Sequence, residues 1–102
     1  MHLVQILLPL RDNDGNPFPR AALDRVRHEL TERFGGATAY MRSPAAGLWK
    51  DDEGDVAHDE VVAVEAMVPH LDLEWWRLYR ADLERRFRQD EVVIRTIACG
   101  RI

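Results

Sequence analysis

Four polar residues stand inside segments of the sequence that are otherwise apolar, and their side chains are the ones best suited to chemistry. They are Gln5, Tyr40, Glu65 and Arg95. A carboxylate or a phenol in an apolar setting can donate or accept a proton, and a guanidinium group can hold an anionic group. If the fold brings these four side chains to one surface, they form a candidate ligand-binding site.

Other chemistries find little support in the sequence. The one serine, Ser43, precedes Pro44 and lacks the glycine-flanked turn of a serine nucleophile. There is no CxxC or HExxH motif and no glycine-rich phosphate loop after a strand. A metal site built on His58 with Asp59 or Glu60 is less expected than an ordinary solvated entrance to a strand. We therefore assign no metal and no cofactor.

The segment that follows the first apolar run begins like a calcium-binding loop. Asp12, Asp14 and Asn16 alternate as the first ligands of such a loop do. Pro17 departs from that pattern, because it falls where the motif requires a glycine. We expect instead a turn in which Asn and Asp side chains bond their own backbone.

The spacing of apolar residues changes along the chain from a period of 2 to a period of 3.6 and back. These changes define the strands and helices that must position the four polar residues. Alternating or β-branched runs predict strands, and apolar residues at three- and four-residue steps predict helices. The predicted strands span residues 2–10, 37–43, 59–68 and 92–99, and the predicted helices span 20–34 and 72–89. Between the second and third strands, Gly47-Leu48-Trp49 and Val56-Ala57 flank a turn signal and predict a small secondary hairpin.

This order of elements, βαββαβ, predicts an α+β fold of the ferredoxin-like kind. Two right-handed crossovers place both helices on one face of a four-stranded antiparallel sheet, in the order 4-1-3-2. The other face of the sheet, the uncovered face, has no helix over it. The 102 residues then form one domain, 1–102.

Strand parity assigns the candidate residues to that uncovered face. Successive side chains of a strand point to opposite faces. If Val4, Ile6 and Leu8 face the helices, Gln5 faces away. The same reasoning sends these residues to the uncovered face: Leu3, Leu7, Thr38, Tyr40, Arg42, Glu65, Met67, Arg95 and Ile97. We expect Glu65 and Arg95 to pair across Gln5.

Composition limits the partners. The formal net charge of −4 argues against a nucleic-acid binder, and Pro9 and Arg11 interrupt the first apolar run too early for a signal or membrane-spanning segment. We expect a cytoplasmic protein with no membrane partner. One cysteine, Cys99, excludes an internal disulfide framework.

Several short motifs resemble a family of small bacterial proteins of unknown function with a ferredoxin-like fold. The resemblance covers residues from about 34 to 95. It rests on Phe34-Gly35-Gly36-Ala37-Thr38, Gly47-Leu48-Trp49 with Gly54, an acidic residue entering the third strand, Tyr79, Arg86-Phe87 and Gln89-Asp90-Glu91-Val92. It implies no catalytic residues. More distantly, the chain resembles the dimeric α+β barrel proteins, which implies that uncovered sheet faces pack in pairs.

The leading hypothesis is a self-associating protein, a homodimer or higher oligomer, that binds an unidentified small molecule on the uncovered face. Its interface would use Leu7, Met67, Ile97 and Trp49, with the Trp49 ring packed over a sheet edge or into a neighbouring subunit. One alternative is a barrel-type enzyme, a cofactor-independent oxygenase or isomerase, with Glu65 or Tyr40 as acid/base and Arg95 holding an anionic group. The other is a purely structural or regulatory partner protein.

Overall fold

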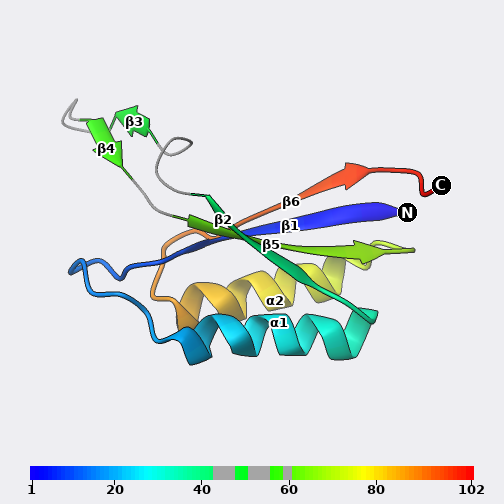
Figure 1. The fold of residues 1–102 in the computed structure, drawn as a ribbon, viewed down its shortest axis with the longest axis horizontal. Coiled ribbons are helices and arrows are strands. Elements are labelled where there is room, and N and C mark those ends of the chain that lie inside the picture. The colour runs from blue at the N-terminus through cyan, green and yellow to red at the C-terminus, as the bar shows by residue number, and fades with distance from the viewer. Residues whose placement is uncertain (43–47, 51–55, 59–60) are drawn as a thin grey trace.

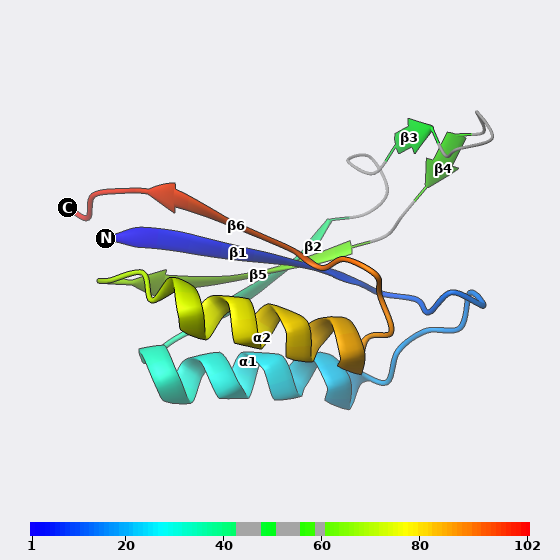
Figure 2. The same cartoon turned by 180° about the vertical axis from the view of Figure 1, so that it is seen from behind.

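The apolar run after Met1 forms the strand β1 (His2–Pro9), which lies in the middle of the sheet. The structure is a computed structural model. It describes the backbone of residues 1–42, 48–50, 56–58 and 61–102, and the side chains of residues 1–39 and 61–102. Within these residues two helices cover one face of the sheet and leave the other face without a helix (Figures 1 and 2).

Four strands pair antiparallel in the main sheet. Besides β1 these are β2 (Thr38–Arg42), β5 (Val61–Val68) and β6 (Val93–Ala98). Their order across the sheet is β2-β5-β1-β6. The four strands of this sheet can be numbered 1 to 4 in chain order, as β1, β2, β5 and β6. Read from the β6 edge, their order is then 4-1-3-2, the order that the sequence predicts. The α+β class is confirmed, with strand ends within one or two residues of those expected.

The predicted secondary hairpin is also present. β3 (Leu48–Lys50) pairs antiparallel with β4 (Val56–His58), with Trp49 opposite Ala57. These two strands form a separate two-stranded sheet rather than extending the main one. The side chain of Trp49 lies outside the described residues, so its predicted contact stays a prediction.

Local chemistry explains where α1 ends and where α2 begins. α1 (Arg20–Phe34) ends at Gly35, whose φ of 86° is the left-handed conformation that glycine adopts without strain, and whose N–H donates to the Thr31 carbonyl at 2.8 Å. α2 (Leu73–Arg86) begins at Asp72, whose carboxylate accepts from the Trp75 N–H at 3.1 Å. In the described part of the chain, neither helix is long and apolar enough to cross a membrane.

α2 ends three residues earlier than predicted. Phe87 turns into the core, where it is 1% exposed, and Arg88 takes a positive φ of 51°. The Gln89 N–H then donates back to the Glu84 carbonyl at 2.9 Å. This bond closes the helix with a left-handed residue that is not glycine, which sequence reasoning had no reason to expect.

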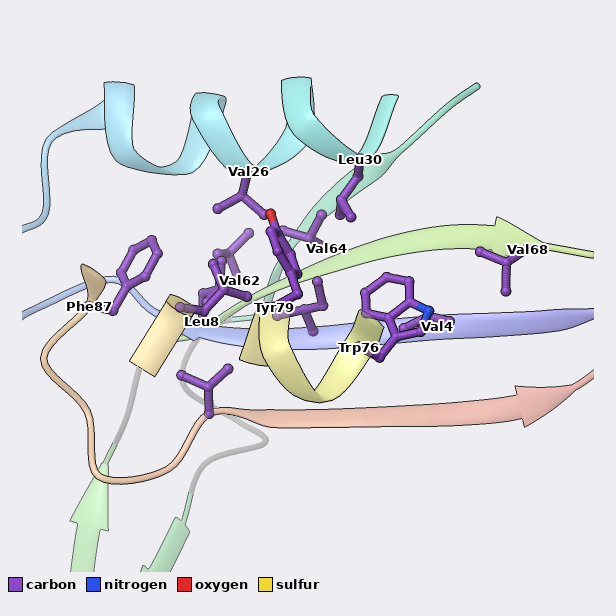
Figure 3. Packing of buried hydrophobic residues seen from close by; sticks show 13 residues of the cluster. Val4, Leu8, Val26, Leu30, Val62, Val64, Val68, Trp76, Tyr79 and Phe87 are labelled. Carbon is purple, nitrogen blue, oxygen red and sulfur yellow. The ribbon is translucent and has the colours of Figure 1, made fainter. Parts of the chain in front are cut away.

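One apolar layer between the helices and the sheet holds the fold together. Side chains of α1 and α2 meet those of β1 and β5 there (Figure 3). Val4, Ile6 and Leu8 are at most 1% exposed, which confirms the predicted parity of β1. Other members of the layer are Val26, Leu30, Val62, Val64, Val68, Trp76, Tyr79, Leu83, Phe87 and Val92.

The loop after β1 is the predicted turn. The Asp12 carboxylate accepts hydrogen bonds from the backbone N–H groups of Asp14 and Asn16, both at 2.9 Å. Its oxygen is therefore engaged by the loop itself, as expected of an Asp-held turn. Among the residues whose side chains are described, no group of three or more His, Cys, Asp and Glu is arranged to hold a metal.

Truncation of α2 on its buried side should weaken the fold much more than the same truncation on its outer side. Leu83 is fully buried and Leu78 is 68% exposed on the same helix. We expect Leu83→Ala to lower the free energy of unfolding by about 3 kcal/mol, because it leaves a cavity. Leu78→Ala should change it by less than about 0.5 kcal/mol. Urea unfolding followed by circular dichroism measures both, and equal losses would contradict this packing.

Candidate functional site

Three of the four predicted residues form one row across the uncovered face. Backbone pairing places Gln5 of β1 directly opposite Glu65 of β5 on one side and opposite Arg95 of β6 on the other. The Gln5 Nε2 donates to the Glu65 carboxylate, and the Arg95 Nε donates to the Gln5 Oε1 at 2.7 Å. We call these three residues the polar row.

The amide at the centre of the polar row is nearly inaccessible to solvent. Gln5 is only 6% exposed, although no helix covers this face in the described part of the chain. Burying an amide is unfavourable unless both of its ends are hydrogen-bonded, and here each end meets a charged group. The charges also fix which way the amide points, because only its NH₂ can donate to Glu65 and only its oxygen can accept from Arg95.

The predicted pairing of Glu65 with Arg95 is therefore indirect. Among the described side chains no ion pair joins them, and Gln5 bridges the two instead. The reason is geometric, since β1 separates their strands and two strand spacings amount to roughly 10 Å. The two charged groups keep capacity for another molecule. One Glu65 oxygen and both terminal nitrogens of Arg95 have no hydrogen-bond partner among the side chains described.

A hollow of about 800 Å³ lies beside the Glu65 end of the polar row. Its wall includes Glu65 itself, with Thr38 directly opposite it on β2. Leu3 and Met67 supply apolar wall, and Arg101 adds a cation. The hollow thus offers one carboxylate, one hydroxyl and apolar surface, a mixture typical of small-molecule sites. Thr38 was placed on this face by parity, but only the structure joins it to Glu65.

Apolar side chains surround the polar row and are open to solvent in the single chain. Met67, Val93 and Ile97 are 43%, 44% and 48% exposed, and Leu7 is half-buried. Cross-strand pairing puts Val93 opposite Leu7 on one side of the polar row and Ile97 opposite Leu3 on the other, so apolar pairs of β1 and β6 flank the row. Exposed apolar side chains that lie together mark an interaction site more often than scattered single residues do.

The fourth predicted residue is located only through its backbone. Tyr40 of β2 pairs with Ala63, two residues along β5 from Glu65. This register agrees with the parity that assigned Tyr40 to the uncovered face. The Tyr40 side chain lies outside the described residues, so its membership of the site stays a prediction.

Sequence reasoning missed a second polar cluster, between the two helices. The Tyr79 hydroxyl donates to the Glu29 Oε1 at 3.0 Å, and the Arg86 Nη1 donates to the same oxygen at 2.8 Å. Figure 3 shows the Tyr79 oxygen directed toward α1. Arg86 also pairs with Asp82 at 3.1 Å. The helical period places Glu29 off the apolar stripe of α1, but it places Arg86 within the stripe of α2, seven residues after Tyr79. A phenol and a guanidinium group on this buried side both needed a partner, and they were the signal for this cluster.

This cluster joins the helices rather than serving chemistry near neutral pH. Burial, and then the neighbouring Glu29 carboxylate, raise the pKa of the Tyr79 hydroxyl well above its ordinary value of 10.0. A phenol with a raised pKa stays protonated and cannot act as a base at neutral pH. The polar row, with its hollow and apolar surround, is therefore the better candidate site.

Comparison with known proteins adds evidence about the fold. No protein-family profile matches the chain, so the resemblance to a family of unknown function is not confirmed. No curated protein matches it either. Among solved structures it is similar to a phage SAM lyase in complex with S-methyl-5′-thioadenosine, at a TM-score of 0.60 and 14% identity over 94% of this chain and 79% of that one. It is also similar to the apo state of a phage SAM lyase, at a TM-score of 0.62 and 14% identity, over 94% and 78% of the two chains. At this identity the likeness shows the α+β fold.

The buried hydroxyl of Tyr79 should make stability fall at alkaline pH. Its pKa is higher in the folded chain than in the unfolded one, so the unfolded chain loses this proton first as the pH rises. This contribution is fully present below about pH 10 and is lost progressively above it. We expect the free energy of unfolding to fall more steeply between about pH 9.5 and 11.5 in the parent than in Tyr79→Phe.

The chain offers an internal reference for that measurement, because its one other tyrosine is Tyr40. Urea unfolding at several pH values gives the slopes for the parent, Tyr79→Phe and Tyr40→Phe. Equal slopes in the parent and Tyr79→Phe would contradict a buried phenol held by Glu29.

Proposed function

We propose that this protein binds a small molecule on the uncovered face of its sheet, with the polar row as the polar end of the site. The observation that carries the proposal is the row itself. Three strands each contribute one residue, and the central amide is 6% exposed within a surface of exposed apolar side chains. A surface that is merely solvated has no need to bury an amide between two charges.

The groups of the polar row that have no hydrogen-bond partner among the described side chains suggest the chemistry of the ligand. A hydroxyl, amine or other donor would meet the second oxygen of Glu65, and apolar or ring atoms would lie against Leu3 and Met67 in the hollow. The phage SAM lyase of similar fold was solved with S-methyl-5′-thioadenosine, whose ribose hydroxyls and purine ring have this mixture of groups. That likeness supports a nucleoside-like molecule as the first probe.

A second candidate function is an enzyme that uses the same site. Glu65 would act as the acid/base, held in position by Gln5, and Arg95 would hold an anionic group. The observation that favours it is the fold itself, since the neighbours of similar structure are lyases by name. Turnover of a bound ligand would separate this function from binding alone.

The polar end of the site can be tested by one substitution and one matched control. Titration calorimetry with S-methyl-5′-thioadenosine should show binding by the parent chain. Glu65→Gln should weaken that binding by about tenfold, because a charge-assisted hydrogen bond becomes a neutral one. Glu91→Gln, which makes the same change of charge at an exposed position, should leave it unchanged.

Mass spectrometry of the protein purified natively and then denatured extends the test to ligands not chosen in advance. Absence of any co-purified molecule, together with no heat from the probe, would contradict the binding proposal. Equal weakening by both glutamine variants would contradict the placement of the site at Glu65.

We also propose that two or more copies associate through this face. The exposed apolar side chains of β5 and β6 support the proposal, because association would remove them from water. Light scattering should report an oligomer at micromolar concentration. Ile97→Glu should shift it to the monomer, because a carboxylate would then be buried without a partner.

A matched control comes from the helical side of the molecule. Leu78 is 68% exposed on α2, so Leu78→Glu adds the same charge to a comparable exposed apolar position away from the sheet. It should leave the oligomer intact. A monomeric parent, or equal effects of the two substitutions, would overturn association through the uncovered face.

A further inference from the structure

A second hollow lies on the helical side of the sheet, away from the polar row. Its volume is about 490 Å³, within the range of ligand-binding cavities. It is bounded by the loop before α1, the first half of α1 and the strands β2 and β5. Partly buried Phe18, Leu23 and Ala39 line it, with the buried Val62 behind them. Its interior is therefore mainly apolar.

The rim of this hollow is cationic. Arg11, Arg20 and Arg27 belong to its lining together with one acid, Asp24, so three positive charges less one negative leave a formal charge of +2. The whole chain carries −4, which makes this rim opposite in sign to the protein as a whole. A cationic rim over an apolar interior is complementary to a molecule with an anionic head and an apolar body.

The ion pairs within the rim leave room for a further anion. Asp24 lies 3.8 Å from the Arg20 Nε and 3.6 Å from the Arg27 Nη1, so one carboxylate is shared between two guanidinium groups. The Arg20 and Arg27 side chains are 91% and 49% exposed, so both can reorient towards a ligand. Arg11 is held by its own loop, where its Nη1 donates to the Gly15 carbonyl at 3.1 Å. Arg20 and Arg27 are thus the groups of the rim available to an anion.

The start of α1 adds to the positive potential at the rim. Pro19 caps the helix without a side-chain hydrogen bond, and the first turn contains no acidic residue. Arg20 occupies that turn instead, where the helix dipole disfavours a cation. Asp24 is the one acid of the rim, so the helix start makes the potential over the apolar hollow more positive.

We propose that this hollow binds an anionic amphiphile. The apolar chain or ring occupies the space against Leu23 and Ala39, and the carboxylate meets the guanidinium groups of Arg20 and Arg27. The site is independent of the polar row, since it lies on the opposite face of the sheet and shares none of the row's residues.

Titration calorimetry of the full chain with three small probes tests both halves of the proposal. Octanoate combines the head and the body, 1-octanol lacks the charge, and acetate lacks the apolar chain. We expect octanoate to bind at least about fivefold more tightly than 1-octanol, and acetate to give no measurable binding. Equal affinities for octanoate and 1-octanol, or no binding of octanoate at millimolar concentration, would overturn the proposal.

Two sets of variants then locate the site. The double variant Arg20→Gln and Arg27→Gln should weaken octanoate binding by about tenfold and leave 1-octanol unchanged, because exposed ion pairs contribute modestly and the apolar contacts remain. Arg25→Gln, on the same helix but outside the lining, is the matched control and should bind octanoate as the parent does. These substitutions change exposed side chains, so they leave the fold intact, as circular dichroism would verify. An unchanged affinity in the double variant, or an equal loss in Arg25→Gln, would overturn the assignment.

Glu65→Gln should leave octanoate binding unchanged, which separates this site from the proposed function.

Discussion

The alternation of side chains along β1 is the constraint on which the rest of the structure depends. β1 pairs with β5 on one side and β6 on the other, so each of its residues is fixed between two partners. Val4, Ile6 and Leu8 point into the layer beneath the helices and form the centre of the core. The residues between them face the other way, and Gln5 is therefore held between Glu65 and Arg95. A shift of one residue in either pairing would exchange the two faces and destroy both the core and the polar row.

The polar row shows how a sheet face that no helix covers can hold charged side chains with little loss of folding free energy. A direct pair between Glu65 and Arg95 would have to cross β1, and the amide of Gln5 bridges that distance with one hydrogen bond to each. The arrangement serves the fold by fixing the register of three strands. It also leaves one carboxylate oxygen of Glu65 beside an open hollow, which is the chemical basis of the proposed binding function.

The two hollows divide the molecule into faces of different character. On the uncovered face the lining combines an acid, a hydroxyl and apolar side chains, whereas on the helical side an apolar interior lies under a cationic rim. The cluster of Tyr79, Glu29 and Arg86 lies between the helices, in neither lining, and holds α1 against α2. Its raised phenol pKa is a consequence of this structural role.

Much of the fold followed from the sequence because its hydrophobic periods are strong. The β-branched run Val61–Val68, the apolar β1 and the Gly35 and Asp72 helix ends each predict their element from local chemistry. Parity alone predicted that Gln5, Glu65 and Arg95 share a face. It could not predict that Gln5 bridges the other two, since that depends on which residues lie directly opposite one another. The left-handed Arg88 and the contact of Tyr79 with Glu29 were also beyond reach, because they arise from packing between segments distant in sequence.

Gln5 is held between two charges on the uncovered face, and its side-chain NH₂ reports on this arrangement directly. In a ¹⁵N-correlated NMR spectrum the chain gives side-chain amide signals from Gln5, Gln89, Asn13 and Asn16 alone, so each can be assigned. We expect the Gln5 NH₂ protons to exchange slowly with water and to shift when Glu65 is changed to Gln, whereas those of the exposed Asn16 should exchange fast and not shift. Fast exchange of the Gln5 NH₂, unaffected by Glu65→Gln, would contradict the polar row and the function built on it.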